Sequence, residues 1–256
     1  MVDLHAHILP GIDDGAATLV DAVAMCHLAA DDGADTIVAT PHRFDGVHED
    51  LPAETLRERT TELQAAVGDR IRIVLGCELH FTHSVVEQLC ETREALPING
   101  GPYVLLEFPP FAFPVGCEHA LYKIAAAGFK PLIAHPERNR AVQEHPERFY
   151  NLAELGLYGQ IDAASLLGKF GKEAEATARL LVTCGLGHAI GSDTHSPKRR
   201  RPGLTRAREV VRQIAGEEAA AALVDANPRA VVDGAPIPHA PEPTVPRPKR
   251  SRWYLF

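Results

Sequence analysis

Two histidines one residue apart, His5 and His7, stand in the opening segment Asp3-Leu-His-Ala-His-Ile-Leu-Pro-Gly-Ile-Asp-Asp-Gly15. Side chains at positions i and i+2 of a β-strand point to the same face of the sheet. A strand over residues 2–8 would therefore present both imidazoles to one metal ion. The carboxylates of Asp13 and Asp14 follow directly, so the segment predicts a metal site at the end of the first strand.

Residues of the same ligand types stand at the end of every other strand that the sequence predicts. Six further short apolar runs span residues 36–39, 71–75, 103–106, 131–134, 157–161 and 188–190. The candidate ligands that follow them are His42, Glu78, Glu107, His135, Asp162, Asp193 and His195. A single histidine at a strand end is usually an ordinary loop residue, but such groups recur at all seven predicted strand ends.

Helical patterns separate these strands, for example over residues 139–155, and two more, over residues 205–214 and 217–225, follow the last strand. Regular alternation of strand and helix is typical of a parallel sheet covered by helices. Seven units favour a barrel, although the alternation alone also fits an open sheet. In a barrel the carboxyl ends of the strands converge on one face, which would bring the candidate ligands into one pocket.

Histidine and carboxylate ligands without thiolates suit Mn²⁺, Zn²⁺ or Fe²⁺. One ion does not need so many ligands, so the sequence favours a cluster of two or three ions with bridging carboxylates. Ions about 3.5–4 Å apart can activate water and hold the oxygens of a phosphoryl group. The predicted chemistry is hydrolysis of a phosphoester by attack of a metal-bound hydroxide on phosphorus.

Arginines stand beside two of these strand ends. Arg138 lies three positions after His135, and the triplet 199–201 follows His195. Guanidinium groups bind phosphate with two parallel hydrogen bonds and stabilise negative charge. Taken alone, the triplet could equally be a solvated loop, and Asp162 could be the N-cap of a helix.

Composition excludes several other classes of protein. The 256 residues fit one large domain, and the net charge of −8 argues against general nucleic-acid binding. The sequence contains no run of about 20 apolar residues, so no membrane span is predicted. The five cysteines contain no C-x-x-C pair, which indicates free thiols in a reducing cytoplasm. No cysteine has an arginine six positions later, so a cysteine-based phosphatase loop is excluded.

The last 21 residues differ from the rest of the chain. Residues 236–256 contain six prolines and carry one acidic against four basic side chains. We therefore expect a catalytic domain over residues 1–235 and an extended, flexible tail over residues 236–256. The tail ends in Trp253-Tyr-Leu-Phe256, which could contact a partner or an anionic surface or could simply be solvated.

Taken together, six segments resemble the polymerase-and-histidinol-phosphatase (PHP) superfamily, and within it the bacterial CpsB/YwqE-type protein-tyrosine phosphatases of capsule and exopolysaccharide operons. These segments are 3–15, Thr40-Pro-His42, Gly76-Cys-Glu78, Leu106-Glu-Phe108, Ala134-His-Pro-Glu-Arg138 and Gly191-Ser-Asp-Thr-His195. The resemblance covers residues 1–233 and implies a TIM-like, distorted (β/α)7 barrel of the α/β class. It also implies three divalent metal ions, commonly Mn²⁺, with Fe or Zn as alternatives.

The resemblance assigns roles to individual residues. The first ion would be held by His5, His7, Glu78 and Asp193, and the second by Glu78, Glu107 and His135. The third would be held by Asp14, His42 and His195, which leaves Asp13 as a turn or supporting residue. Arg138 would bind the substrate phosphate with one arginine of the triplet, either Arg200 or Arg201, of which Arg201 is preferred because a proline follows it.

The implied substrate is phosphotyrosine on the tail of a bacterial tyrosine autokinase that controls polysaccharide export. A small-molecule phosphatase of the histidinol-phosphate type would use the same ligands and is the first alternative. A non-catalytic binding module is a second alternative, although no expected ligand position is degenerate. Alanine-rich helical surfaces permit a homo-oligomer. The proline-rich tail has no counterpart in the family pattern.

Overall fold

The computed structural model describes residues 1–92 and 96–246. The basic and aromatic end of the expected tail, residues 247–256, lies outside the described residues. The strands in the described part are β1 Val2–Ala6, β2 Thr36–Ala39, β3 His42–Arg43, β4 Arg72–Leu75, β5 Glu78–His80, β6 Tyr103–Glu107, β7 Lys130–Ala134, β8 Tyr158–Asp162 and β9 Ala189–Gly191. The α-helices are α1 Leu19–Asp31, α2 Ala53–Val67, α3 His83–Thr92, α4 Cys117–Ala126, α5 Arg140–Glu144, α6 Pro146–Ala153, α7 Ala163–Leu166, α8 Lys172–Thr183, α9 Leu204–Ala221 and α10 Asn227–Val232. Short 3₁₀ turns (η1 Gly68–Arg70, η2 Ile98–Gly100 and η3 Pro136–Arg138) and a π-helical turn (η4 Ala222–Ala226) complete the chain.

All strand pairs are parallel, and the strands form two sheets, with the orders β1-β2-β4 and β3-β5-β6-β7-β8-β9. Two residues separate β2 from β3 and β4 from β5, so each pair acts as one interrupted strand. An isolated parallel bridge between Ala6 and Thr194 joins β1 to the segment after β9. The strands thus occupy seven positions around a ring, which confirms the distorted α/β arrangement, although the described residues form no single closed ladder.

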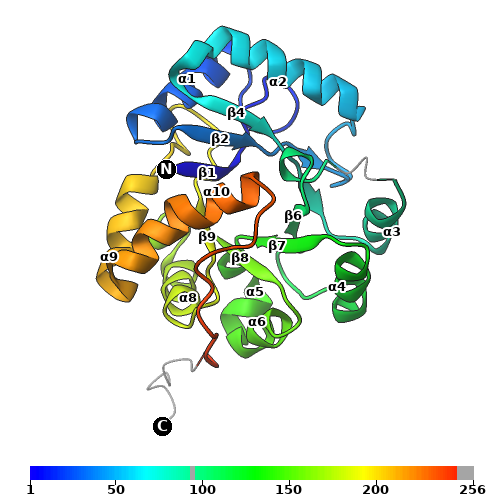
Figure 1. Ribbon diagram of the computed structural model, residues 1–256, viewed down its shortest axis with the longest axis vertical. Coiled ribbons are helices and arrows are strands. Elements are labelled where there is room, and N and C mark those ends of the chain that lie inside the picture. The colour runs from blue at the N-terminus through cyan, green and yellow to red at the C-terminus, as the bar shows by residue number, and fades with distance from the viewer. Residues whose placement is uncertain (93–95, 247–256) are drawn as a thin grey trace.

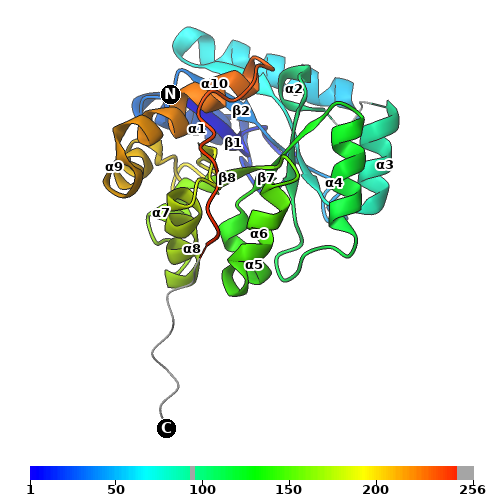
Figure 2. The same ribbon diagram turned by 60° about the horizontal axis from the view of Figure 1, so that its bottom comes forward.

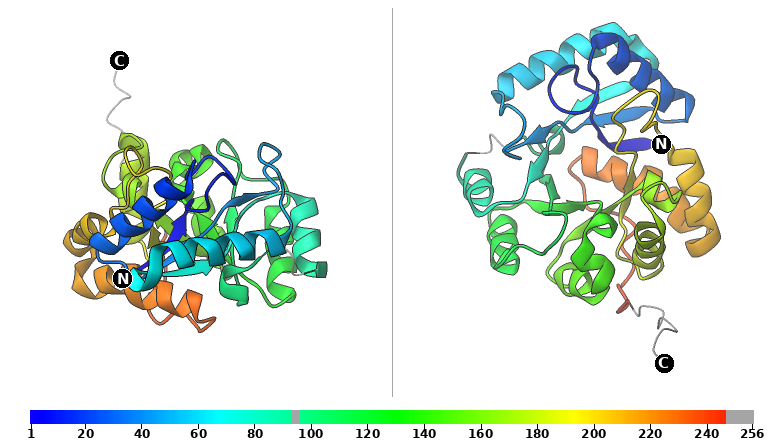
Figure 3. Two further views of the ribbon diagram at one scale, coloured as in Figure 1. Left: turned by 90° about the horizontal axis from the view of Figure 1, so that it is seen from above. Right: turned by 180° about the vertical axis from the view of Figure 1, so that it is seen from behind.

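Helices cover the outside of this ring (Figure 1). The view from above in Figure 3 shows α1 and α2 packed along one side of the strands. Inside the ring, alternate strand residues form an apolar cluster that includes Leu4, Val38, Leu105 and Leu132. This alternation follows from the two-residue period of a strand and fills the ring with side chains below the polar ends of the strands.

The helix predicted over residues 139–155 is two helices, α5 and α6. His145 separates them with φ −138° and ψ 68°, and Pro146 begins α6. The proline ring disfavours helical backbone at the preceding residue, so the single long helix was a wrong prediction. The helices predicted over residues 205–214 and 217–225 correspond to α9 and the turn η4 that follows it. Gly216, with φ 89°, interrupts the helical backbone of α9 between them.

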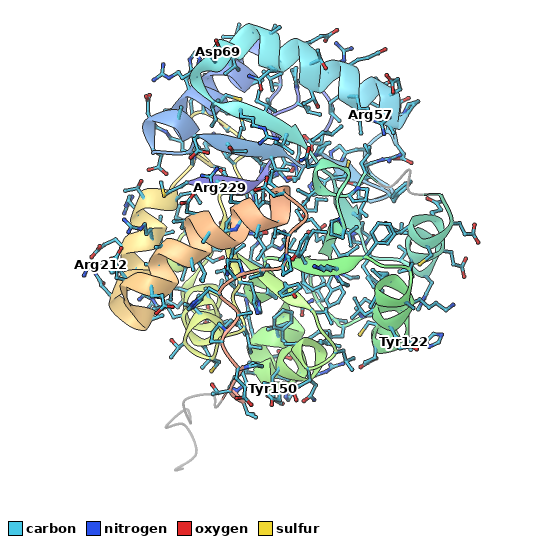
Figure 4. All side chains as sticks on the ribbon, in the orientation of Figure 1. Arg57, Asp69, Tyr122, Tyr150, Arg212 and Arg229 are labelled. Atoms are coloured by element: carbon cyan, nitrogen blue, oxygen red, sulfur yellow. The ribbon has the colours of Figure 1, made fainter. Side chains whose placement is uncertain are left out.

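One end of the ring is closed by α10, which crosses it in Figure 1 and lies behind the strands in the right panel of Figure 3. Arg229, labelled in Figure 4, extends from α10 and pairs with Asp35 at 2.9 Å and Asp225 at 2.7 Å. Exposed pairs of this kind contribute little to stability. The apolar residues Val231 and Val232 of the same helix complete the interior cluster.

Residues 236–246 differ from the expected flexible tail. They contain no helix or strand, yet Ile237 is buried in the interior cluster. The side-chain amide of Asn227 donates to the His239 carbonyl at 2.7 Å and accepts from its N–H at 3.0 Å. Farther on, the Thr244 N–H donates to the Cys184 carbonyl at 2.9 Å. These bonds hold the segment, red in Figure 2, along the outside of the strands and helices. The domain boundary after residue 235 stays a prediction.

His188, at the start of β9, is buried and neutral. Its Nδ1 accepts a hydrogen bond from the Gly159 N–H at 3.1 Å, and burial lowers its pKa from 6.5 to about 4. The unfolded chain therefore binds more protons than the folded chain between pH 6.5 and pH 4, and stability falls as the pH is lowered through this window. Between pH 7 and pH 5 the loss assigned to His188 is about 2 kcal/mol.

The variant His188→Gln keeps an acceptor for the Gly159 N–H but has no proton to bind. We expect its free energy of unfolding, measured with urea, to fall by about 2 kcal/mol less than that of the parent between pH 7 and pH 5. Equal losses in the two proteins would show that His188 does not titrate as a buried neutral imidazole.

Candidate metal centre

A β-bulge in β1 lies beside the two opening histidines. The pairing of β1 with β2 shifts by one residue between Asp3 and Ala6. Before the bulge, Leu4 packs into the interior cluster, and after it Ala6 packs outward into the main core. Bulges of this kind re-aim side chains next to active sites, and here the bulge leaves His5 and His7 facing each other.

The Nε2 atoms of His5 and His7 lie 3.1 Å apart. The other ring nitrogen of each histidine is already engaged, because the Nδ1 of His5 lies 2.8 Å from the Gln160 side-chain oxygen and that of His7 lies 2.7 Å from an Asp13 oxygen. These oxygens accept a hydrogen bond from the Nδ1–H group, so in the neutral form of each ring the Nε2 lone pair points at the other ring. Such an arrangement requires positive charge between the rings.

Glu78 lies at the centre of the candidate site and is 1% exposed. Its Oε2 atom is 3.2 Å from His5 Nε2, 3.3 Å from His7 Nε2 and 3.2 Å from His42 Nδ1, yet it has no hydrogen-bond partner in the structure. Its Oε1 atom lies 2.9 Å from His135 Nε2. A buried carboxylate oxygen facing three ring nitrogens fits a divalent cation bound among them.

The nine predicted ligands form four overlapping groups whose ligand atoms lie within 4.8 Å of one another. The groups are His7, Asp14, His42 and His195; His5, Glu78 and His135; His5, His7 and Asp193; and His42, Glu78 and Glu107. The pairing of β3 with β5 places His42 directly beside Glu78. Because several residues belong to two groups, the geometry suits a cluster with shared ligands better than one isolated ion.

Charge within the cluster is balanced between histidines and carboxylates. Burial acts to lower the pKa of His5, but the charges of Glu78 and Asp193 outweigh it and raise that pKa to about 9. Burial likewise opposes ionisation of Glu78, whose pKa is nevertheless held well below its usual value by His5, His135 and His7. A metal ion would replace the protons that these carboxylates otherwise keep on the imidazoles.

Two candidate ligands have strained backbone conformations. His135 and Asp193 have φ values of 31° and 49°, in the left-handed region that non-glycine residues rarely adopt. Strain of this kind persists where the surrounding structure fixes a residue for a function. Close packing adds to this, because a Cβ at Gly15 would lie 2.1 Å from the His7 carbonyl oxygen, and one at Gly191 would lie 2.6 Å from His5 Cβ.

Two arginines reach the same cavity, which has a volume of about 310 Å³. Arg138 Nη1 lies 2.5 Å from Asp193 Oδ2 and 3.4 Å from Asp162 Oδ2, and Arg200 Nη2 pairs with the same Asp193 oxygen. Arg201, the preferred residue of the triplet, is exposed and is not among the cavity-lining residues. Arg200 therefore replaces Arg201 as the candidate.

The loop itself explains this placement. The carbonyl oxygen of Arg200 accepts hydrogen bonds from the Thr194 hydroxyl at 2.6 Å, from the His195 N–H at 3.2 Å and from the Ser196 N–H at 3.3 Å. Three donors on one carbonyl fix the backbone at this position, and Arg200 then faces the cavity. Asp162, the remaining strand-end candidate, caps α7 by accepting from the Ala164 N–H at 2.7 Å and supports Arg138 rather than joining a ligand group.

Several residues at the site had no signal in the sequence analysis. Gln160 orients His5 and donates its own amide to the Ile161 carbonyl at 2.9 Å. His48 stacks on His42 with ring centroids 5.7 Å apart and pairs with Asp45, which lines the cavity. His80 also lines the cavity, beside Glu107.

Asp13 supports the cluster without belonging to a ligand group. Its Oδ2 atom accepts from His7 Nδ1 at 2.7 Å and from the His42 N–H at 3.1 Å, and its Oδ1 atom accepts from the Gly15 N–H at 3.0 Å. All these partners are donors, so the amide group of Asp13→Asn would face at least one of them. Loss of such a supporting contact typically weakens metal binding about 10- to 100-fold.

We expect Asp13→Asn to bind Mn²⁺ about 10- to 100-fold more weakly than the parent when Mn²⁺ is titrated into metal-stripped protein. Asp69→Asn, at the outer edge of the molecule in Figure 4, is the matched control and should bind like the parent. An affinity of Asp13→Asn within about twofold of the parent would remove this role for Asp13.

The sequence is similar to those of known proteins. The family model described as capsular polysaccharide synthesis, CpsB/CapC, matches residues 1–233. Tyrosine-protein phosphatase YwqE of Bacillus subtilis is 37% identical over 221 residues, with coverage of 85% of this chain and 86% of the relative. Tyrosine-protein phosphatase CpsB of Streptococcus pneumoniae is 30% identical over 240 residues, with coverage of 91% and 98%.

The fold is similar to that of a solved structure as well. That structure comes from work on YwqE of Bacillus subtilis and CpsB of Streptococcus pneumoniae, described as unique metal-dependent tyrosine phosphatases. It superposes with a TM-score of 0.90 at 33% identity and covers 96% of this chain and 99% of its own. The residues matched by the family model, 1–233, include all nine candidate ligands. The chain belongs to the CpsB/CapC family of capsular polysaccharide synthesis proteins, whose YwqE and CpsB members are PHP-type phosphatases.

Proposed function

We propose that this protein is a metal-dependent protein-tyrosine phosphatase. The observation that carries the proposal is the convergence of four overlapping ligand groups and two arginines on one cavity. The relatives named as tyrosine-protein phosphatases support it. Phosphoester hydrolysis needs both parts, since cations and guanidinium groups together neutralise a phosphate while water attacks it.

The proposed cofactor is a cluster of three divalent ions, with Mn²⁺ as the proposed metal and Fe or Zn as alternatives. The ligands would be His5, His7, Asp14, His42, Glu78, Glu107, His135, Asp193 and His195, grouped as the family resemblance implies. When bound, such ions supply Lewis acidity and lower the pKa of a water molecule. The shared position of Glu78 in two ligand groups suits a bridging carboxylate.

The side chains around the cavity would hold the substrate. Arg138 and Arg200 each use one N–H on Asp193 and retain others that can bind phosphate oxygens. The rim is open, because Asp14 is 54% exposed and Val47 is 80% exposed. An open rim suits a tyrosine presented by a protein better than a small metabolite, which a closed pocket would surround.

We further propose that the substrate is the phosphotyrosine-bearing tail of a bacterial tyrosine autokinase that regulates capsular or exopolysaccharide synthesis. The family description and the tyrosine phosphatases among the relatives support this class of substrate. A cytoplasmic location is proposed with it, since all five cysteines are free thiols. No helix in the described part of the chain is sufficiently long and apolar to cross a bilayer.

The test compares hydrolysis of a phosphotyrosine peptide with hydrolysis of histidinol phosphate by the protein as purified, with metal content measured in parallel. We expect faster turnover of the peptide, inhibition by a chelator, and insensitivity to thiol reagents. Preference for histidinol phosphate would favour the small-molecule alternative. Full activity after removal of all metal would overturn the proposal.

A further inference from the structure

Phe170 lies beside both cavity arginines although nothing in the sequence marks it as a site residue. It stands in the connection between α7 and α8. The N–H groups of Gly168 and Lys169 in this connection donate to carbonyls of α7 at 2.9 Å, which fixes the turn. Asp162, the N-cap at the other end of α7, also contacts Arg138, so this arginine is contacted from both sides of α7 in the sequence.

The ring of Phe170 lies within cation–π distance of both guanidinium groups. The Cζ atom of Arg138 lies 4.4 Å from the ring centroid, and the Cζ atom of Arg200 lies 5.4 Å from it. Both distances are within the range in which a cation is attracted to the face of an aromatic ring. The two arginines come from separate loops, and the structure shows two groups in contact with both of them, Phe170 and the Asp193 carboxylate.

Asp193 alone would hold the arginines poorly for catalysis. One of its oxygens lies 3.5 Å from His5 Nε2 and 3.4 Å from His7 Nε2, so this carboxylate also serves a ligand group. An arriving phosphate competes with the other oxygen for the same N–H groups. The Phe170 ring does not compete in this way, because it attracts the guanidinium charge and has no oxygen that accepts hydrogen bonds from the N–H groups.

We infer that Phe170 is a positioning residue that holds Arg138 and Arg200 together for a phosphate group. The inference rests on the proposed function, since it assigns these arginines to the substrate. An aliphatic side chain of similar volume would fill the space without attracting the guanidinium groups. The expected consequence is weaker phosphate binding by about 5- to 30-fold, the range that corresponds to a partly desolvated cation–π contact.

The experiment uses the full chain loaded with Mn²⁺ and titrates inorganic phosphate by calorimetry. Phe170→Leu removes the aromatic face, and Phe170→Tyr restores it. The control is Phe113→Leu, because Arg148 lies at the same 4.4 Å from the Phe113 ring but does not line the cavity. Metal content, and KM and kcat for a phosphotyrosine peptide, are measured on each variant.

We expect Phe170→Leu to bind phosphate 5- to 30-fold more weakly and to show a higher KM, with metal content unchanged. Phe170→Tyr and Phe113→Leu should bind within twofold of the parent. Parent-like binding by Phe170→Leu, or equal losses in the leucine and tyrosine variants, would overturn the inference. A parent protein that binds phosphate in this pattern but does not hydrolyse phosphotyrosine would instead contradict the proposed function alone.

Discussion

Replacing Glu78 with glutamine should abolish metal binding and lower kcat/KM on a phosphotyrosine peptide by at least about 1,000-fold. The Oε2 atom of this residue faces ring nitrogens of His5, His7 and His42 at 3.2–3.3 Å. The amide of glutamine is neutral and would direct either its N–H₂ group or a weaker acceptor at those nitrogens. One substitution therefore removes a shared ligand from two groups at once.

The matched control is Glu137→Gln. Glu137 is as buried as Glu78, but its carboxylate accepts from the Asp162 N–H at 3.0 Å and belongs to no ligand group. Burial raises its pKa, so the neutral glutamine resembles a form that this position tolerates. We expect this control to retain its metal in elemental analysis. Glu78→Gln protein with full metal content and activity within threefold of the parent would rule out Glu78 as a central ligand.

The sequence predicts the strands and their ligand-bearing ends well because both depend on local pattern. Short apolar runs with polar residues immediately after them identify the parallel strands, and the spacing of His5 and His7 predicts two imidazoles on one side. The β1 bulge could not be predicted in this way, because it depends on how β1 pairs with β2 and with the segment after β9. In a regular strand Leu4 and Ala6 would share a face, and the bulge is what places them in different clusters.

Supporting residues are harder to identify because their residue types have many ordinary roles. Gln160 and Phe170 would read as a strand residue and a loop residue in any α/β protein, and only the fold brings them to His5 and to Arg138. The choice within the arginine triplet failed for a related reason. A proline after Arg201 is a local signal, whereas the hydrogen bonds to the Arg200 carbonyl depend on residues 194–196.

Replacing Arg138 with lysine should lower kcat/KM by about 100- to 1,000-fold while metal content stays unchanged, because lysine keeps the charge but lacks the planar pair of donors that matches phosphate. Arg200→Ala should have a similar effect, since Arg200 shares Asp193 with Arg138. The neighbouring Arg201→Ala is the matched control. Its side chain is exposed and lies outside the cavity, so we expect activity within about threefold of the parent, as for an ordinary surface substitution.

The comparison of Arg200→Ala with Arg201→Ala distinguishes a fixed loop from one that rearranges. If the bonds to the Arg200 carbonyl hold during catalysis, only Arg200 can reach the phosphate, and the two variants must differ by more than about 30-fold. Equal losses would show that the loop turns when substrate binds and exchanges the two side chains. Metal content measured on both proteins distinguishes either outcome from damage to the neighbouring candidate ligands Asp193 and His195.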